Sequence, residues 1–335
     1  KNFLIIYTSF TEVRRYFNYP NVTFKKNKFN QDNYIKKIFS ILYIYFFTLL
    51  NSKKIRSIEF FTLPFLKIKK CYNIFTIHDL RRIYFSESIF IKFLYKFFFS
   101  FFLRSADNII VVSHSIKKEI LSYFNKLKVS VIYNTIDYSS FKKINNKNLI
   151  KIKKKYNLPE KFILCVGHLE RRKNYIRLIK AINILNQDKE KINLVIVGQK
   201  SRETKKILNI IEELNLKKNI KIFNKLNDFE VRCFYKLSSL FVFPSTYEGF
   251  GIPILEAMAS KTPMVLSNTD VFREITENKY IYFDQYDPLS IAQNIKLVLG
   301  DKKLQKKMIN YGNKRIISFT LEKQKKEIHK FYNNL

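Results

Sequence analysis

The stretch "STYEGFGIPILEA" (residues 245–257) carries two glutamates that could bind a polyhydroxylated ligand. Glu248 and Glu256 stand eight positions apart, and Gly249 and Gly251 lie between them in a chain with only six glycines among 335 residues. An ionised carboxylate accepts hydrogen bonds only, so it suits the hydroxyl pair of a ribose or a hexose. The glycines permit a turn that exposes backbone N–H groups, which suit phosphate or sugar oxygens. We therefore predict a ligand that combines sugar and phosphate.

Three cations precede a predicted helix in a second stretch, "CVGHLERRKNYIRLI". Arg171, Arg172 and Lys173 follow a predicted strand that ends at Gly167, and the helix is predicted to begin around Asn174. A helix N-terminus already carries partial positive charge, so cations there are unfavourable unless an anion sits among them. A diphosphate would remove that conflict.

Each motif also has a purely structural alternative. Glu256 alone fits a carboxylate near a helix N-terminus, Glu248 alone fits a charge on a surface loop, and the cations alone fit a solvated basic loop. The occurrence of both glutamates with both glycines in one short stretch favours the ligand site.

Six continuous apolar runs in the second half of the chain are typical of strands buried on both faces, and helical patterns separate them. The runs are 162–167, 192–198, 220–223, 240–245, 263–267 and 280–283. This alternation predicts an α/β fold with parallel sheets. Gly167, Gly198, Gly249 and Gly251 lie at the ends of these runs or just beyond them, where open parallel sheets bind ligands.

The first half of the chain is less regular but follows the same pattern. Residues 73–80, 107–115 and 129–137 are strand-like runs that end in polar residues, and a charged stretch near 143–158 separates the two halves. We therefore expect three segments. They are an N-terminal domain at 1–145, a C-terminal ligand-binding domain at 146–315, and a C-terminal helix at 316–335 that packs on the N-terminal domain.

The formal charge of +35 invites an anionic partner. Nucleic acid is one class, but the chain lacks the motifs of nucleic-acid-binding folds, so we predict no nucleic-acid partner. An anionic membrane surface is the second class. A general bias towards Lys, Asn, Ile, Phe and Tyr is the alternative origin of the charge.

Two aromatic segments in the first third carry flanking lysines, at 38–52 and 90–104. The first contains about 15 uncharged residues, and a membrane-spanning helix needs about 20. We interpret each segment as a buried core helix in the first instance, and as an interfacial membrane helix in the second.

The cysteines point to a reducing compartment. Cys71, Cys165 and Cys233 are single and match neither a disulfide framework nor a metal-ligand spacing. No signal peptide is visible at the start. We expect a cytoplasmic protein that lies peripherally on the inner face of the cytoplasmic membrane.

Taken together, "GHLERRKN" and "STYEGFGIPILEA" resemble the retaining glycosyltransferases of family 4. The second motif is the more specific, with its two glutamates around Gly-Phe-Gly. The resemblance extends to "TIHDL" (76–80), "RSADNIIVVSHSIKKEI" (104–120) and "VIYNTID" (131–137). It implies the GT-B fold, two facing Rossmann-like domains with a cleft between them. The wording of the motifs is most similar to mannosyl- and rhamnosyl-type enzymes of surface polysaccharide synthesis.

The resemblance also implies roles for individual residues. Arg172 and Lys173 would neutralise the donor diphosphate near Gly167, and Glu256 would hold the ribose hydroxyls. Glu248 would contact hydroxyls of the donor sugar, beside the backbone N–H groups of Phe250, Gly251 and Ile252. His78 matches the family histidine that faces the donor sugar. The catalytic set is therefore His78, Arg172, Lys173 and Glu248.

Departure of a nucleoside diphosphate builds negative charge on its β-phosphate, and fixed cations and N–H dipoles stabilise that charge. Because side chains and a helix N-terminus supply this stabilisation, we predict neither a metal nor a cofactor. The implied activity is transfer of a sugar, such as mannose or rhamnose, from a nucleotide-sugar donor to a lipid-linked glycan or polysaccharide acceptor.

The N-terminal stretch departs from the family pattern. Family members carry a glycine-rich loop after the first strand, but here "NFLIIY" is followed by "TSFTEVRRYF" and the chain begins at Lys1. We expect either a truncated N-terminus or a lost loop. His168 and Thr135 also differ from the usual residues. A non-catalytic nucleotide-sugar-binding scaffold is therefore the alternative function.

Overall fold

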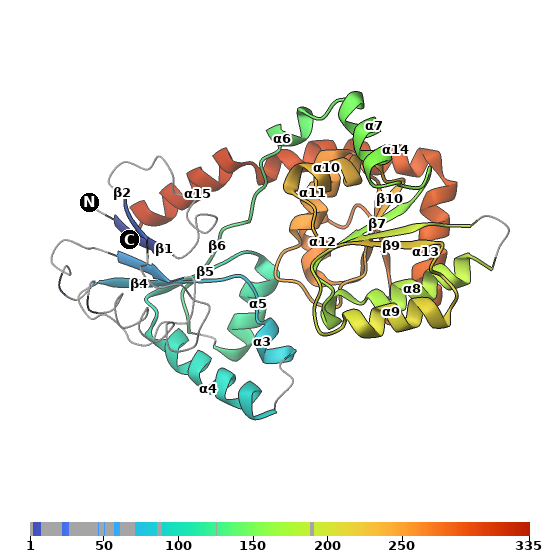
Figure 1. The fold of residues 1–335 in the computed structure, drawn as a ribbon. Coiled ribbons are helices and arrows are strands. Elements are labelled where there is room, and N and C mark those ends of the chain that lie inside the picture. The colour runs from blue at the N-terminus through green and yellow to red at the C-terminus, as the bar shows by residue number, and fades with distance from the viewer. Residues whose placement is uncertain are drawn as a thin grey trace. The chain divides into compact units, whose positions relative to one another are not determined.

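The structure, a computed structural model, describes residues 3–7, 22–26, 46, 50, 57–60, 71–85, 89–124, 126–187 and 191–335. The chain divides into two compact units, each with its own parallel sheet (Figure 1). Unit 1 comprises Lys1–Tyr133 and Leu321–Leu335, and unit 2 comprises Asn134–Thr320.

Unit 1 contains a four-stranded parallel sheet in the order β3-β4-β5-β6. The strands are β3 (Ser57–Phe60), β4 (Tyr72–Ile77), β5 (Asn108–Val111) and β6 (Val129–Val131). A separate parallel pair joins β1 (Phe3–Tyr7) to β2 (Val22–Lys26). The predicted strands at 73–80, 107–115 and 129–137 are confirmed, whereas β2 and β3 were not predicted because their runs are short and mixed.

Four helices complete the described part of unit 1. They are α3 (Arg81–Tyr84), α4 (Ile89–Ser105), α5 (His114–Tyr123) and α15 (Leu321–Asn333). Although α15 comes from the C-terminus, its Ile328 lies in one core cluster with Ile74, Ile110 and Ile132. Burial of these apolar side chains fixes α15 on this sheet.

Unit 2 contains a six-stranded parallel sheet in the order β12-β11-β10-β7-β8-β9. The strands are β7 (Ile163–Val166), β8 (Leu194–Val197), β9 (Ile220–Phe223), β10 (Leu240–Phe243), β11 (Met264–Ser267) and β12 (Ile281–Phe283). All six predicted runs are confirmed. They read as continuous apolar runs because helices cover both faces of the sheet (Figure 1).

Helices and short helical turns surround this sheet. They are α6 (Ser139–Lys142), α7 (Asn146–Lys155), η2 (Arg171–Lys173), α8 (Tyr175–Leu185), α9 (Thr204–Glu213), α10 (Asp228–Leu237), α11 (Ile252–Ser260), α12 (Asp270–Thr276), α13 (Pro288–Gly300), α14 (Lys302–Arg315) and η3 (Ile316–Phe319).

The boundary between the units falls after Tyr133, earlier than the predicted boundary after residue 145. Two apolar residues explain the difference. Phe141 is buried under the Arg232 guanidinium of α10, 5.7 Å from its ring centroid, and Lys236 donates a hydrogen bond to the Ile144 carbonyl at 3.3 Å. The charged stretch is thus attached to unit 2 by the few apolar residues that it contains.

The first interpretation of segment 90–104, a buried core helix, is wrong for most of its described side chains. Among the α4 side chains that the structure describes, Phe99 and Leu103 are buried, while Phe90 and Phe93 are 69% and 66% exposed. The apolar composition of the segment favoured burial, but composition does not tell which side of a helix packs against the rest of its unit. Segment 38–52 lies outside the described residues except for Phe46 and Leu50. Among the residues described, no helix is both long and apolar enough to cross a membrane.

Candidate functional site

Two neighbouring strands bring the sequence motifs together. β7 pairs with β10 in parallel, Leu164 opposite Phe241, so the loops that follow the two strands leave the same edge of the sheet. The first loop carries Gly167 and the turn η2, and the second carries Glu248. The sheet thus places side chains that are far apart in sequence within contact distance.

Hydrogen bonds tie the two loops to each other. The Thr246 N–H donates to the Arg172 carbonyl at 2.8 Å, and the Asn174 side-chain amide donates to the Pro244 carbonyl at 3.1 Å. Asn174 takes a left-handed conformation (φ 59°) between η2 and α8, a conformation that asparagine tolerates better than most residues. Its amide also reaches the Gln285 carbonyl at 2.7 Å. The helix start predicted around Asn174 is confirmed.

Glu248 forms ion pairs with Arg172 and Lys173, the two residues that we predict to bind the donor diphosphate. Its Oε2 lies 2.7 Å from Arg172 Nη1, and its Oε1 lies 2.6 Å from Lys173 Nζ. The three side chains are only 9–11% exposed. Arg172 Nε also contacts Glu170 Oε2 at 2.9 Å. Two cations and two carboxylates therefore balance, and the cations are held in place by anions of the protein itself.

The pKa of Glu248 reflects this environment. Burial favours the neutral carboxyl, but the positive charges of Lys173 and Arg172 outweigh burial and hold the pKa of Glu248 below its ordinary value. The carboxylate is therefore ionised at neutral pH. An ionised carboxylate has about four lone-pair sites, so it can accept further hydrogen bonds from a ligand hydroxyl.

Two glycines allow close packing beneath Lys173. Gly167 has φ +153°, and a Cβ at this position would lie 2.9 Å from Lys173 Cε. A Cβ at Gly198 would lie only 1.8 Å from the Gly167 carbonyl oxygen. Lys173 Nζ lies 4.9 Å from the centroid of the Phe243 ring on β10. These glycines at the strand ends thus serve close packing beneath the cation.

Glu256 has a different partner. Its Oε2 accepts a hydrogen bond from the Tyr235 hydroxyl of α10 at 2.9 Å. Burial raises the pKa of Glu256, and the Tyr235 hydrogen bond opposes that rise. Helix α11 begins at Ile252 after Gly251, so Glu256 lies in its second turn.

The Gly-Phe-Gly segment forms the entry to α11. Phe250 is buried and packs edge-to-face on Phe319, with ring centroids 5.9 Å apart. Gly251 has φ +109°, a conformation that L side chains rarely adopt, and Pro253 occupies the first turn, where its missing N–H costs no hydrogen bond. Ile252 is 41% exposed. Packing of Phe250 therefore fixes where the N-terminus of α11 starts.

His78 lies in unit 1 and directly follows β4, with its side chain exposed. Unit 2 holds the other predicted residues, and it brings Arg172, Lys173 and Glu248 into direct contact. Sequence reasoning missed Tyr235, whose position in a helical core pattern carries no functional signal.

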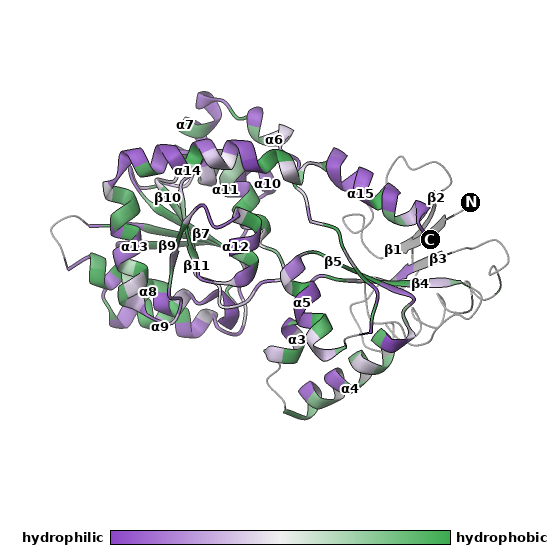
Figure 2. Cartoon of the chain, turned by 180° about the vertical axis from the view of Figure 1, so that it is seen from behind, coloured by the Kyte–Doolittle hydropathy of each residue, from purple (hydrophilic) through white to green (hydrophobic). Residues whose placement is uncertain are grey.

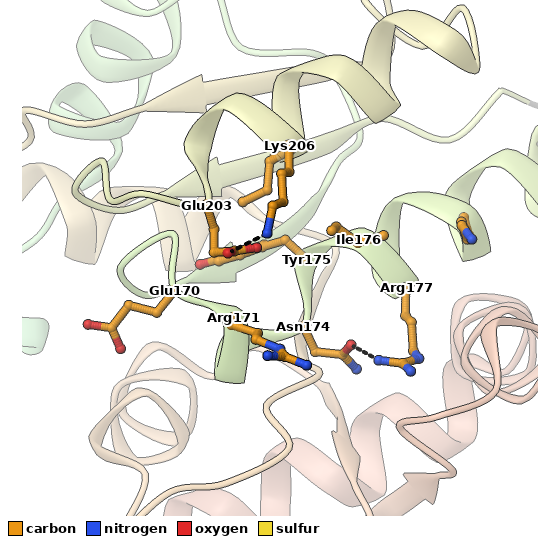
Figure 3. Close-up of a pocket in the computed structure, with 10 residues that line it drawn as sticks. Glu170, Arg171, Asn174, Tyr175, Ile176, Arg177, Glu203 and Lys206 are labelled. Atoms are coloured by element: carbon orange, nitrogen blue, oxygen red, sulfur yellow. Dashed lines mark hydrogen bonds and ion pairs between the residues drawn. The ribbon is translucent and has the colours of Figure 1, made fainter. Parts of the chain in front are cut away.

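A pocket of about 440 Å³ opens beside the same loop, between η2, α8 and α9 (Figure 3). Arg171, Asn174 and Arg177 line it, and Lys206 is paired with Glu203 at 3.0 Å. Neither Glu248 nor Glu256 lines this pocket. The predicted ligand residues therefore do not belong to it.

The sequence profile described as "Glycosyl transferases group 1" matches residues 146–315, half of the chain, and "Glycosyltransferase Family 4" matches residues 57–140. The chain belongs to the group 1 glycosyltransferases. The matched regions include the loops of unit 2 that carry Arg172, Lys173 and Glu248.

This group 1 glycosyltransferase is similar to two curated enzymes. It is 29% identical to the O-antigen chain mannosyltransferase RfbU of Salmonella typhimurium, over 73% of this chain and 65% of RfbU. It is 30% identical to the serotype-specific mannosyltransferase WbdA of Escherichia coli, over 59% of this chain and 25% of WbdA. The matches thus span less than two thirds of either relative's own length.

Among solved structures, Anabaena Alr3699/HepE in complex with UDP matches with a TM-score of 0.77 at 15% identity, over 100% of both chains. This likeness concerns the fold alone. It agrees with the predicted GT-B class, with α/β units built on parallel sheets.

Within the described ranges, no group of three His, Cys, Asp or Glu side chains could hold a metal ion. The absence of a metal or cofactor requirement stays a prediction. Its support is the presence of two cations, Arg172 and Lys173, where a diphosphate is expected.

Proposed function

We propose that this chain is a retaining glycosyltransferase that moves a sugar from a nucleotide-sugar donor to a lipid-linked glycan or polysaccharide acceptor in cell-surface glycan synthesis. The observation that carries the proposal is the buried contact of Arg172 and Lys173 with Glu248 at the carboxyl edge of the unit 2 sheet. The named activities of RfbU and WbdA support mannose as the first donor sugar to test.

In this proposal Arg172 and Lys173 bind the donor diphosphate. As the bond from sugar to phosphate breaks, negative charge grows on the leaving phosphate, and fixed buried cations stabilise that charge more than they stabilise the bound donor. Glu248 holds both cations in place before the donor arrives, so little reorganisation is needed. Its remaining lone pairs accept hydrogen bonds from hydroxyls of the donor sugar.

Glu256 accepts hydrogen bonds from the ribose hydroxyls, and the hydrogen bond from Tyr235 orients its carboxylate. The N–H groups of Phe250, Gly251 and Ile252 face the sugar and phosphate oxygens. The resemblance assigns His78 to the donor sugar. The anionic inner face of the cytoplasmic membrane would present the lipid-linked acceptor.

Donor binding and turnover test the proposal. The full chain is titrated with GDP-, UDP- and dTDP-sugars by calorimetry, and sugar transfer is then followed with the donor that binds, with and without EDTA. We expect transfer that EDTA does not abolish. Binding without transfer or donor hydrolysis would select the non-catalytic scaffold, and no binding to any donor would contradict both functions.

Lys173→Met supplies the matched test of the site, because methionine keeps the apolar stem and removes the charge. Transfer should slow by roughly 100-fold, the usual cost of losing one preorganised charge at a developing anion. Lys180→Met, on the exposed surface of α8, is the control and should retain parental activity. Equal rates for the two variants would remove Lys173 from the reaction.

A further inference from the structure

The proposed donor site uses Arg172 and Lys173 of the basic loop but not Arg171. Glu248 pairs with Arg172 and Lys173, whereas Arg171 is exposed and lines the pocket of about 440 Å³ between η2, α8 and α9. Pockets that bind small molecules have volumes of about 300 to 1,000 Å³. The basic loop therefore supplies a cation to a second place that is large enough for a small ligand.

Arg177, another cation of this pocket, is held in a fixed position. Its Nη1 donates a hydrogen bond to Asn174 Oδ1 at 3.1 Å, and its guanidinium lies 5.5 Å from the centroid of the Tyr286 ring. Asn174 is only 4% exposed, and its amide donates to the Pro244 and Gln285 carbonyls. Figure 3 shows Arg177 turned towards Asn174. Because a guanidinium has five N–H donors, Arg177 keeps donors for a ligand.

The protein itself does not neutralise these two arginines. Among the residues that the structure describes, no carboxylate forms an ion pair with Arg171 or Arg177, and the nearby Glu170 pairs with Arg172 instead. The first turn of α8 contains no acidic residue either. Arginine matches phosphate oxygens in a bidentate geometry. Two uncompensated guanidinium groups in one pocket therefore favour a ligand with a phosphate group.

A carboxylate and apolar side chains also line the pocket. Glu203, whose side chain is 21% exposed, pairs with Lys206 at 3.0 Å, and its remaining lone pairs can accept hydrogen bonds from hydroxyls (Figure 3). Ile176 and Ile207 add apolar surface, and α8 and α9 carry both hydrophobic and hydrophilic residues (Figure 2). A phosphorylated sugar needs this combination, because it carries a phosphate, hydroxyls and the C–H groups of its ring.

We propose that this pocket binds a phosphorylated sugar, with Arg171 and Arg177 on the phosphate and Glu203 on the hydroxyls. The ligand is separate from the donor, since neither Glu248 nor Glu256 lines the pocket. General attraction of anions by the formal charge of +35 is the competing explanation. It does not account for a guanidinium that a buried asparagine holds in place.

Titration calorimetry of the full chain with hexose phosphates tests the proposal. The panel contains the 1-phosphates and 6-phosphates of glucose, mannose and galactose, with glucose and inorganic phosphate as partial probes. We expect one hexose phosphate to bind about tenfold more tightly than inorganic phosphate, because hydroxyl hydrogen bonds add to the phosphate contacts. Glucose should bind more weakly than either. No donor or acceptor is present, so failure of the inference and failure of the proposed function are distinguishable.

Two results of this titration would overturn the proposal. Equal affinities for inorganic phosphate and for every hexose phosphate would show an anion site that does not recognise a sugar. Absence of binding across the whole panel would show that the pocket takes no such ligand.

Single variants locate the bound ligand. Arg171→Met and Arg177→Met should each weaken binding of the hexose phosphate about tenfold, the usual effect of losing a charged hydrogen bond. Lys154→Met is the matched control, because it removes the same charge from an exposed position on α7 and should match the parent. Thermal unfolding shows whether each variant is folded, and the exposed position of Arg171 keeps the test available if Arg177→Met is not.

The same variants can also contradict the proposal. An equal loss of affinity in Lys154→Met would show attraction by net charge alone. A larger loss in Lys173→Met than in Arg171→Met and Arg177→Met would place the hexose phosphate among the residues proposed for the donor diphosphate. Either result would remove the pocket as a sugar-phosphate site.

Discussion

Lys173 and Glu248 stand 75 positions apart in the chain, yet the Nζ of one lies 2.6 Å from the Oε1 of the other. Arg172 contacts the second carboxylate oxygen at 2.7 Å. The site proposed for the donor diphosphate therefore already contains an anion that belongs to the protein. A bound diphosphate and Glu248 would share the same two cations, which makes the charge of Glu248 a sensitive point for mutation.

Glu248→Gln should lower stability and turnover but raise the affinity for the nucleoside diphosphate product. Removal of one member of a buried ion-pair cluster leaves uncompensated charge, so the free energy of unfolding should fall by about 3 kcal/mol. The freed cations should bind a nucleoside diphosphate roughly tenfold more tightly, equivalent to about 1.4 kcal/mol. Sugar transfer should slow. Urea unfolding, calorimetry and a transfer assay measure the three effects.

Glu170→Gln is the control for this variant. Of the two cations Arg172 and Lys173, Glu170 pairs with Arg172 alone, and its side chain is 33% exposed. We expect smaller changes in the same directions. If Glu248→Gln weakens diphosphate binding, Glu248 does not compete with the ligand for the cations.

Gly198→Ala should distort the loop that carries the cations. The added methyl would lie 1.8 Å from the Gly167 carbonyl oxygen, so the backbone must move, and we expect a loss of about 2–3 kcal/mol of unfolding free energy, as for other overpacked sites. Gly300→Ala is the matched control, since its methyl would meet no atom within 4 Å at the end of a helix. Thermal unfolding compares them; equal melting temperatures would contradict the close-packing role of Gly198.

Tyr235→Phe should move the acid limit of donor binding. Burial raises the pKa of Glu256 above its ordinary 4.5, and the hydrogen bond from Tyr235 lowers it, so loss of that bond raises the pKa further. The ionised carboxylate is the form that accepts hydrogen bonds from two hydroxyls. As the medium is acidified, donor affinity should therefore decline at a higher pH in the variant than in the parent, which titration calorimetry across pH measures.

Glu256→Gln removes the titrating group and should abolish this acid limit. Because the folded pKa of Glu256 lies above its unfolded value, its stabilising contribution is present below pH 4.5 and is lost as pH rises through the folded pKa. The variant should thus gain stability relative to the parent as pH rises. A parental pH profile in both variants would separate Glu256 from the donor.

Glu230→Gln should reduce the sensitivity of the fold to acid. Burial opposes ionisation of Glu230, but hydrogen bonds from Lys155 and Tyr156, at 2.6 and 2.7 Å, lower its pKa to about 2. This lowered pKa contributes stability that is present above pH 4.5 and is lost as pH falls towards 2. At neutral pH the variant should lose ~2 kcal/mol of unfolding free energy, and its stability should change less with acid.

Glu160→Gln is the control for Glu230→Gln. Glu160 also contacts a lysine, Lys153, at 2.7 Å, but its side chain is 88% exposed, where an ion pair contributes little. Urea unfolding from neutral to acidic pH should leave this variant close to the parent. Equal losses in the two variants would mean that burial of Glu230 does not matter.

Much of unit 2 follows from local sequence. The six apolar runs become strands because each is long enough to cross a sheet and is bounded by helical patterns or glycines. The helix starts near Asn174 and at Pro253 follow from residues that tolerate those backbone conformations. In unit 1 the mixed runs of β2 and β3 gave no comparable signal, since their pairing depends on neighbours distant in the chain.

The sequence by itself determined the parallel α/β units, the family and the residue types that suit a nucleotide sugar, because periodicity, glycines and charge are local properties. Tertiary structure alone decided that Glu248 lies between Arg172 and Lys173, that Tyr235 is the partner of Glu256, and that Gly198 makes room for the Gly167 carbonyl. It also decided which side chains of α4 are buried. These relationships depend on which strands and helices become neighbours, and long-range burial, not local pattern, sets that choice.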